Sequence, residues 1–109
     1  MTATNFEDFV QSIAEEAPHA VILDWYRRLE LMVRDYIVSR GIRYRNATHA
    51  EAVVQADSLL GTPVADAVGR LRRVRNEAAH TSQIVTSQEA VNFARESLSL
   101  IGQLWSAER

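Results

Sequence analysis

An arginine and a histidine lie five positions apart in the last third of the chain, and together they could cleave a phosphodiester without a metal ion. Arg75 carries a permanent positive charge that could hold a phosphate, and the imidazole of His80 could move a proton. Asn76 follows the arginine directly, and two alanines precede the histidine. The sequence therefore suggests phosphoryl chemistry at residues 75–80.

The spacing of this pair restricts how a helix can use it. Five residues along an α-helix amount to about 500°, which leaves the side chains of Arg75 and His80 about 140° apart. Asn76 and His80 share a face, and Arg72 and Arg73 lie on or near it. The helix could end just before His80 and release the imidazole, or a second copy of the chain could complete the site across a twofold axis. We favour the second arrangement, because one arginine and one histidine make a small active site.

A second candidate feature is an aromatic residue between two arginines, Arg43, Tyr44 and Arg45. They fall in a predicted connection at 41–47, where the ring could stack on an exposed base. We predict that these three residues, with Arg72 and Arg73, bind substrate. The alternative is a solvated arginine face that is neutralised by nearby acids.

Composition places the chain among small soluble domains. Its 109 residues suit a single domain spanning 1–109, and the net charge of −2 argues against a protein that coats nucleic acid non-specifically. There is no cysteine, and the three histidines lack metal-ligand spacing, so we expect no cofactor or metal. Neither a signal peptide nor a membrane span is recognisable, which predicts a cytoplasmic protein without a membrane partner.

Hydrophobic periodicity predicts helices throughout and no strand. Thr4 with Glu7, Thr48 with Glu51 and Thr86 with Glu89 have capping-box spacing, Gly41 is a stop signal, and Thr62–Pro63 begins a helix. Gly69 marks either close helix packing or a weak point. Most of the aromatic residues lie on apolar stripes and are expected in the core or an interface. We therefore predict an all-α, up-and-down bundle of four or five helices, at about 5–16, 18–40, 48–61, 62–80 and 86–105.

The segment Arg-Asn-Glu-Ala-Ala-His at 75–80, late in a helix of a small all-α protein, resembles the signature of HEPN domains. That signature is an arginine, a polar residue that is often asparagine, three more residues and a histidine. The longer segment 71–80, with a capped C-terminal helix after it, is particularly similar to the DUF4145 branch. The resemblance covers about residues 18–106, and its specific part is 71–80.

The resemblance implies a HEPN-like helical bundle that dimerises and brings two such motifs into one cleft. Many HEPN domains are metal-independent ribonucleases that act as toxins or defence effectors, and others are inactive binding modules. By this resemblance Arg75 would contact the scissile phosphate, His80 would activate the 2′-hydroxyl or protonate the leaving oxygen, and Asn76 would orient either group. One branch has a tyrosine two residues after the histidine, where this chain has Ser82.

We therefore expect a homodimeric endoribonuclease with RNA as its substrate and an antitoxin or other defence protein as a further partner. The first alternative is an inactive HEPN-like module that binds a protein or nucleic acid. In that case Arg75 would pair with an acid, and His80 would only cap the end of its helix. The second alternative is an adaptor bundle whose apolar surface binds another protein.

Overall fold

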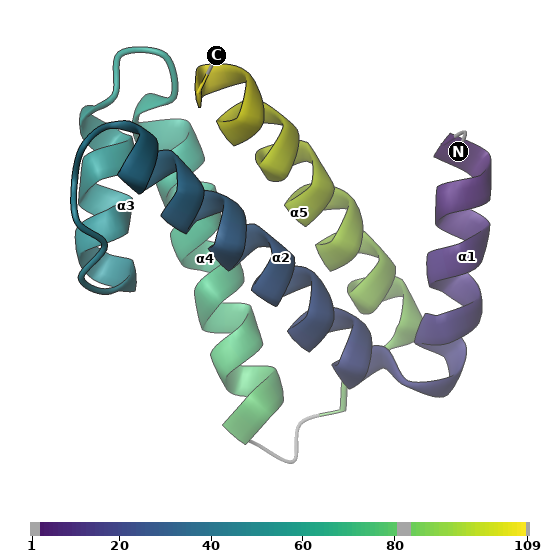
Figure 1. Cartoon of the computed structure of the whole chain (residues 1–109). Coiled ribbons are helices and arrows are strands. Elements are labelled where there is room, and N and C mark those ends of the chain that lie inside the picture. The colour runs from purple at the N-terminus through teal and green to yellow at the C-terminus, as the bar shows by residue number, and fades with distance from the viewer. Residues whose placement is uncertain (1–2, 81–83, 109) are drawn as a thin grey trace.

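The computed structural model describes residues 3–80 and 84–108, and it is all-helical over these residues. The prediction of an all-α bundle with four or five helices is confirmed (Figure 1). The helices are α1 (Ala3–Glu16), α2 (Pro18–Ser39), α3 (Ala47–Ala56), α4 (Gly61–His80) and α5 (Ser87–Glu108).

The bundle is built around the pairing of α2 with α5, the most extensive contact between helices. The α3–α4 hairpin packs on one side of this pair, and α1 packs on the other (Figure 1). The connection after α2 runs back along α3, so α2 and α3 point the same way and the directions do not alternate at every step. The thinnest dimension is 19 Å, about two helix diameters, so most helices have one face near solvent.

The core is formed by the apolar stripes that the sequence predicts. Leu29 and Ile37 of α2 and Leu104 of α5 have no exposed surface. The predicted core aromatics Tyr26, Tyr36 and Phe93 are buried, whereas 51% of Trp105 is exposed. The apolar periodicity therefore identified the buried faces of these helices.

Two predicted helix boundaries are confirmed by their hydrogen bonds. Gly41 has a φ of +74°, and its N–H donates to the carbonyl of Val38 (2.9 Å), which closes the end of α2. At the start of α5 the backbone N–H of Glu89 donates to Oγ1 of Thr86 (3.1 Å), and the two side chains also bond to each other (3.1 Å).

The predicted cap at Thr48 is wrong. Oδ1 of Asn46 accepts the backbone N–H of His49 (2.9 Å), so α3 begins two residues earlier than a Thr48 cap requires. It also ends at Ala56 rather than at residue 61, and Leu59 is 75% exposed. The predicted start of α4 at Thr62–Pro63 is displaced to Gly61.

The predicted cap at the start of α1 lies partly outside the described residues, because the side chain of Thr4 is among those not described. Its predicted partner Glu7 bonds to Arg95 of α5, with 2.8 Å between Oε1 and Nη2. The helix itself begins at Ala3, two residues before its predicted start. Glu7 therefore attaches α1 to α5.

Asp57, in the α3–α4 connection, links this connection to α2. One carboxylate oxygen accepts the backbone N–H groups of Leu59 (2.7 Å) and Leu60 (3.1 Å). The other accepts the hydroxyl of Tyr36 and Nη2 of Arg40 (3.1 Å). The same Arg40 nitrogen donates to the carbonyl of Ala107 at the end of α5 (2.9 Å). The carboxylate thus ties α2 and the α3–α4 turn together, and Arg40 extends the network to α5.

Replacing Asp57 by asparagine tests this network. Only 10% of the Asp57 side chain is exposed, so losing its charge-assisted bonds should lower the free energy of unfolding by about 1–3 kcal/mol. Urea unfolding measures the change, with the exposed Asp66→Asn as a matched control. Equal stabilities of the two variants would show that the network contributes nothing.

The same carboxylate predicts an acid dependence of stability. The hydroxyl of Tyr36, as the main cause, with the N–H groups of Leu59 and Leu60, lowers the pKa of Asp57 below its ordinary value of 3.8. A lowered folded-state pKa stabilises the protein above pH 3.8, and this contribution is lost as the pH falls through the lowered value. Urea unfolding at several pH values below 4 should therefore show a steeper decline for the wild type than for Asp57→Asn. Parallel declines would contradict the assignment.

Candidate functional site

The candidate residues lie in the second half of α4, where Arg75 occupies a position in the apolar stripe. Residues 64, 68, 71, 75 and 78 follow one another at intervals of four and three, and all except Arg75 are buried apolar residues. Arg75 is therefore directed toward the body of the bundle and is half-buried. An arginine in a core stripe is unusual and needs a physical reason.

The surroundings of Arg75 hold it without neutralising it. Nη1 donates to Oδ1 of the neighbouring Asn76 (3.2 Å), and the guanidinium carbon lies 5.8 Å from the centroid of the Tyr26 ring on α2. Burial, with a smaller contribution from Glu30, raises the pKa of Tyr26 to about 12, so this phenol stays neutral. Both contacts orient the guanidinium, and neither supplies a negative charge.

Arg75 differs in this respect from six other arginines of the described chain. Within the described residues it has no carboxylate oxygen within salt-bridge distance, whereas the arginines at positions 28, 34, 40, 70, 72 and 95 each have one. The alternative expectation that Arg75 pairs with an acid is therefore wrong for the part of the chain that is described. Its positive charge remains available to an external anion.

His80 is the last residue of α4 and is exposed. The helix continues through this residue, so the arrangement in which it ends just before His80 is wrong. The continuous helix leaves the side chains of Arg75 and His80 about 140° apart. One chain alone therefore does not direct both groups at the same phosphate.

The face of α4 that carries His80 carries a different arginine. Arg73, Asn76 and His80 are spaced by three and four, so they lie on one side of the helix. Arg73 is exposed and has no carboxylate partner among the described residues. Asn76 is half-buried and connects this face to Arg75 through its amide oxygen. The residue two positions beyond His80, Ser82, lies outside the described residues.

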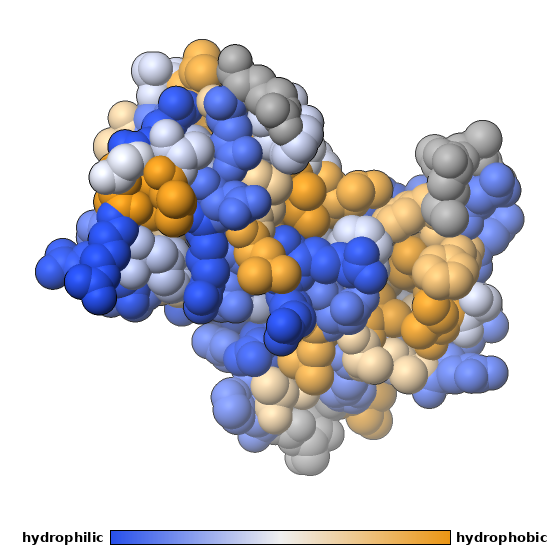
Figure 2. All heavy atoms as spheres, viewed as in Figure 1, coloured by the Kyte–Doolittle hydropathy of each residue, from blue (hydrophilic) through white to orange (hydrophobic). Residues whose placement is uncertain are grey.

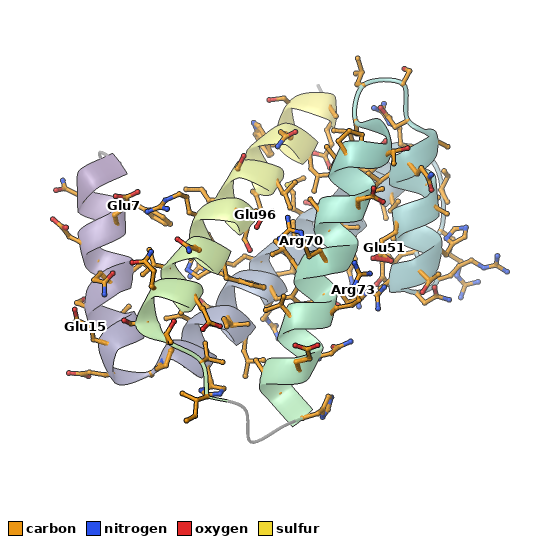
Figure 3. All side chains as sticks on the ribbon, turned by 180° about the vertical axis from the view of Figure 1, so that it is seen from behind. Glu7, Glu15, Glu51, Arg70, Arg73 and Glu96 are labelled. Atoms are coloured by element: carbon orange, nitrogen blue, oxygen red, sulfur yellow. The ribbon has the colours of Figure 1, made fainter. Side chains whose placement is uncertain are left out.

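Arg72, one of the predicted substrate-binding residues, is engaged within the fold. Its Nε and Nη2 donate to the two carboxylate oxygens of Glu51 on α3, both at 3.2 Å. Figure 3 shows Glu51 between α3 and α4, close to Arg73. Only 28% of the Arg72 side chain and 15% of the Glu51 side chain are exposed. This bidentate ion pair joins the two helices, which leaves Arg72 little capacity for substrate.

Gly69 gives Glu51 the space for this ion pair. A Cβ at position 69 would lie 2.6 Å from Oε1 of Glu51, closer than atoms normally approach. Of the two interpretations of Gly69 in the sequence, close packing is therefore correct. The cavity between α3 and α4, about 350 Å³ and lined by Gly69, Arg72 and Arg73, is polar.

In the second candidate feature, the two arginines lack an acid partner in the described ranges, whereas Tyr44 already contacts other residues. Arg43 and Arg45 are exposed and have no acid partner in the described ranges. Tyr44 is half-buried and packs against the core, and the guanidinium carbon of Arg34 lies 4.4 Å from its ring centroid. A base could stack on Tyr44 only after displacing Arg34. The structure thus leaves Arg43 and Arg45 available to phosphates and places Tyr44 in a supporting position.

Sequence reasoning missed two residues that organise the site, Tyr26 and Glu51. Tyr26 was expected in the core or an interface, and its ring also lies beside Arg75. Glu51 was assigned to a capping box because it lies three residues after Thr48. Such a local spacing cannot reveal that its partner is Arg72, 21 positions away. No group of three or more histidine, aspartate or glutamate residues suited to a metal ion occurs among the described residues.

No family model, curated protein or solved structure matches the chain. The HEPN resemblance therefore rests on residues 71–80 and on the helical bundle around them. In the described part of the chain, no helix is both long enough and apolar enough to cross a membrane.

The crowding at Gly69 can be measured with a double-mutant cycle. Alanine in a helix interior is favoured over glycine by about 1 kcal/mol, but in the wild type Gly69→Ala must also displace Glu51. We expect Gly69→Ala to raise the free energy of unfolding by about 1 kcal/mol in a Glu51→Ala background and by clearly less in the wild type. Urea unfolding of the wild type, the two single variants and the double variant gives the coupling free energy between positions 51 and 69. Equal gains in the two backgrounds would contradict the close packing.

Proposed function

We propose that this chain is a HEPN-type endoribonuclease that cleaves RNA without a metal ion, as a cytoplasmic homodimer acting as a toxin or defence effector. The observation that carries the proposal is the state of Arg75, which is half-buried, oriented by Asn76 and Tyr26, and without a carboxylate partner in the described chain. The motif at 75–80 supplies the histidine that such a reaction needs.

The position of Arg75 favours phosphate as its missing partner. Partial burial of a guanidinium has a desolvation cost that an opposite charge can offset. The planar group matches two phosphate oxygens, and its orientation by Asn76 and Tyr26 lowers the entropic cost of binding. RNA supplies such a phosphate next to a 2′-hydroxyl.

The reaction follows from these groups. His80, as the free imidazole, takes the proton of the 2′-hydroxyl, and the resulting oxygen attacks the adjacent phosphorus. The bond from phosphorus to the 5′-oxygen breaks. The imidazole of His80, now protonated, gives its proton to that oxygen. The products are a 2′,3′-cyclic phosphate and a 5′-hydroxyl. Arg75 stabilises the charge that develops on the non-bridging oxygens.

A second copy is needed because the two side chains diverge within one helix. About 140° separates Arg75 from His80 around α4, so we place the arginine of one protomer opposite the histidine of its partner. The exposed position of His80 at the end of the helix favours this arrangement, since the imidazole can reach across a twofold axis.

Cleavage of mixed RNA in EDTA tests the activity. We expect the wild type to produce 2′,3′-cyclic phosphate ends and expect His80→Ala and Arg75→Ala to lose at least about 100-fold in rate. Circular dichroism confirms that the variants are folded. Arg70→Ala is the matched control, because Arg70 pairs with Glu96 of α5 and should not affect cleavage (Figure 3). Equal cleavage by the wild type and both site variants would exclude the site.

Mixing the two inactive variants tests the shared site. In a heterodimer of Arg75→Ala with His80→Ala, one of the two shared sites recovers both wild-type groups. Random assortment makes half of the dimers mixed, so the mixture should recover about a quarter of the wild-type activity. This activity should appear only after the two variant dimers have exchanged subunits. A mixture that stays inactive after exchange, measured with the same assay, would place both groups of each site in a single protomer.

A second candidate function is an inactive HEPN-like module that binds nucleic acid or an antitoxin. It is favoured by the divergence of Arg75 and His80 in one chain and by the neutralisation of Arg72 through Glu51. This candidate predicts salt-dependent RNA binding without cleavage. Binding would then weaken in Arg43→Ala and Arg45→Ala and would be insensitive to His80→Ala.

A further inference from the structure

An apolar groove of about 420 Å³ lies between α1 and the first half of α2. Phe6, Phe9 and Ile13 line it from α1, and Trp25 lines it from α2. Phe9 is 57% exposed and Ile13 is 39% exposed. Figure 2 shows apolar side chains gathered where α1 meets the start of α2, with hydrophilic side chains around them. Grouped apolar side chains of this kind mark interaction surfaces, whereas single exposed ones do not.

The groove has a packed base. The rings of Phe6 and Trp25 meet edge to face, with centroids 5.4 Å apart and planes at 84°. Val10 and Val21 also line the groove and are almost completely buried. A ligand would therefore meet a preformed surface and would not have to order it first, which favours binding.

The spacing of the α1 residues suits a helical ligand. Phe6, Phe9 and Ile13 occupy positions i, i+3 and i+7, which places them along about 10 Å of one helix face. An amphipathic helix with its own apolar residues at such intervals can lie in the groove and bury them.

The charge around the groove restricts the sequence of that helix. Residues 5–24 contain five acids and no lysine or arginine. Glu7 pairs with Arg95, and Asp24 pairs with Arg28. Asp8, Glu15 and Glu16 have no basic partner among the described residues, so this end of the molecule carries an excess of negative charge. A ligand with lysine or arginine beside its apolar stripe would complement it.

We propose that the α1–α2 groove binds a basic amphipathic helix of another protein. The proposal uses no residue of α4 and does not depend on RNA cleavage. The apolar stripe of the ligand would cover Phe9 and Ile13, and its basic residues would lie over the acids of α1.

The test is fluorescence anisotropy with the full chain and two labelled peptides of about 18 residues, each about five helical turns. Both have the same leucine stripe, and one has arginine at the flanking positions where the other has glutamate. We expect the basic peptide to bind at least about tenfold more tightly than the acidic one, with a preference that weakens at high salt. Binding should weaken at least about tenfold in the Phe9→Ser, Ile13→Ser double variant.

Matched variants separate the groove from general stickiness. Leu31→Ser removes an equally exposed leucine elsewhere on α2 (52% exposed) and should bind like the wild type. Glu15→Gln with Glu16→Gln should reduce the preference for the basic peptide. If the double groove variant does not fold, Phe9→Ser alone replaces it.

Four results would overturn the proposal. The first three are equal binding of the two peptides, equal loss of binding in the Leu31→Ser control, and unchanged binding in the groove variants. A fourth is that the Phe9→Ser, Ile13→Ser substitutions abolish self-association of the wild type. In that case a second copy of this chain, and not a different protein, occupies the groove.

Discussion

The geometry of one uninterrupted helix determines how Arg75 and His80 are oriented relative to each other. α4 turns by about 100° per residue from Gly61 to His80, and no break allows Arg75 and His80 to face the same way. Arg75 therefore lies beside α2 in the apolar stripe, and His80 projects from the exposed end. The guanidinium is held against Tyr26 in a fixed direction, while the imidazole is left available to another molecule.

Two ion pairs join α4 to neighbouring helices, and both use arginines that the charge pattern alone does not distinguish. Arg72 joins α4 to α3 through Glu51, and Arg70 joins it to α5 through Glu96. With these partners occupied, the arginines without a carboxylate partner in the described chain include 43, 45, 73 and 75. The sequence alone does not distinguish the roles of its twelve arginines. The fold separates those that pair with an acid from those that are available to an anion.

Hydrophobic periodicity was sufficient to predict the helices and the core, but it could not predict which polar groups bond to one another. The stripe ending at Ala78 predicted α4 and its buried face because burial of apolar side chains follows the helical repeat. The cap at Thr48 was wrong because Asn46, a better cap, stands two residues earlier. The Glu51–Arg72 pair and the Asp57 network connect residues from 17 to 67 positions apart. Only the folded arrangement brings such residues together.

The proposed activity requires that each site be shared between the α4 ends of two copies of this chain. The chain has no cysteine, so Ala79→Cys, at an exposed position beside His80, gives a single spin label for each protomer. Pulsed electron paramagnetic resonance then measures the distance between the two labels. A shared site requires a defined distance shorter than about 30 Å, the length of α4 itself. Labels that show no coupling at concentrations where the protein is active, or only distances well above that length, would contradict it.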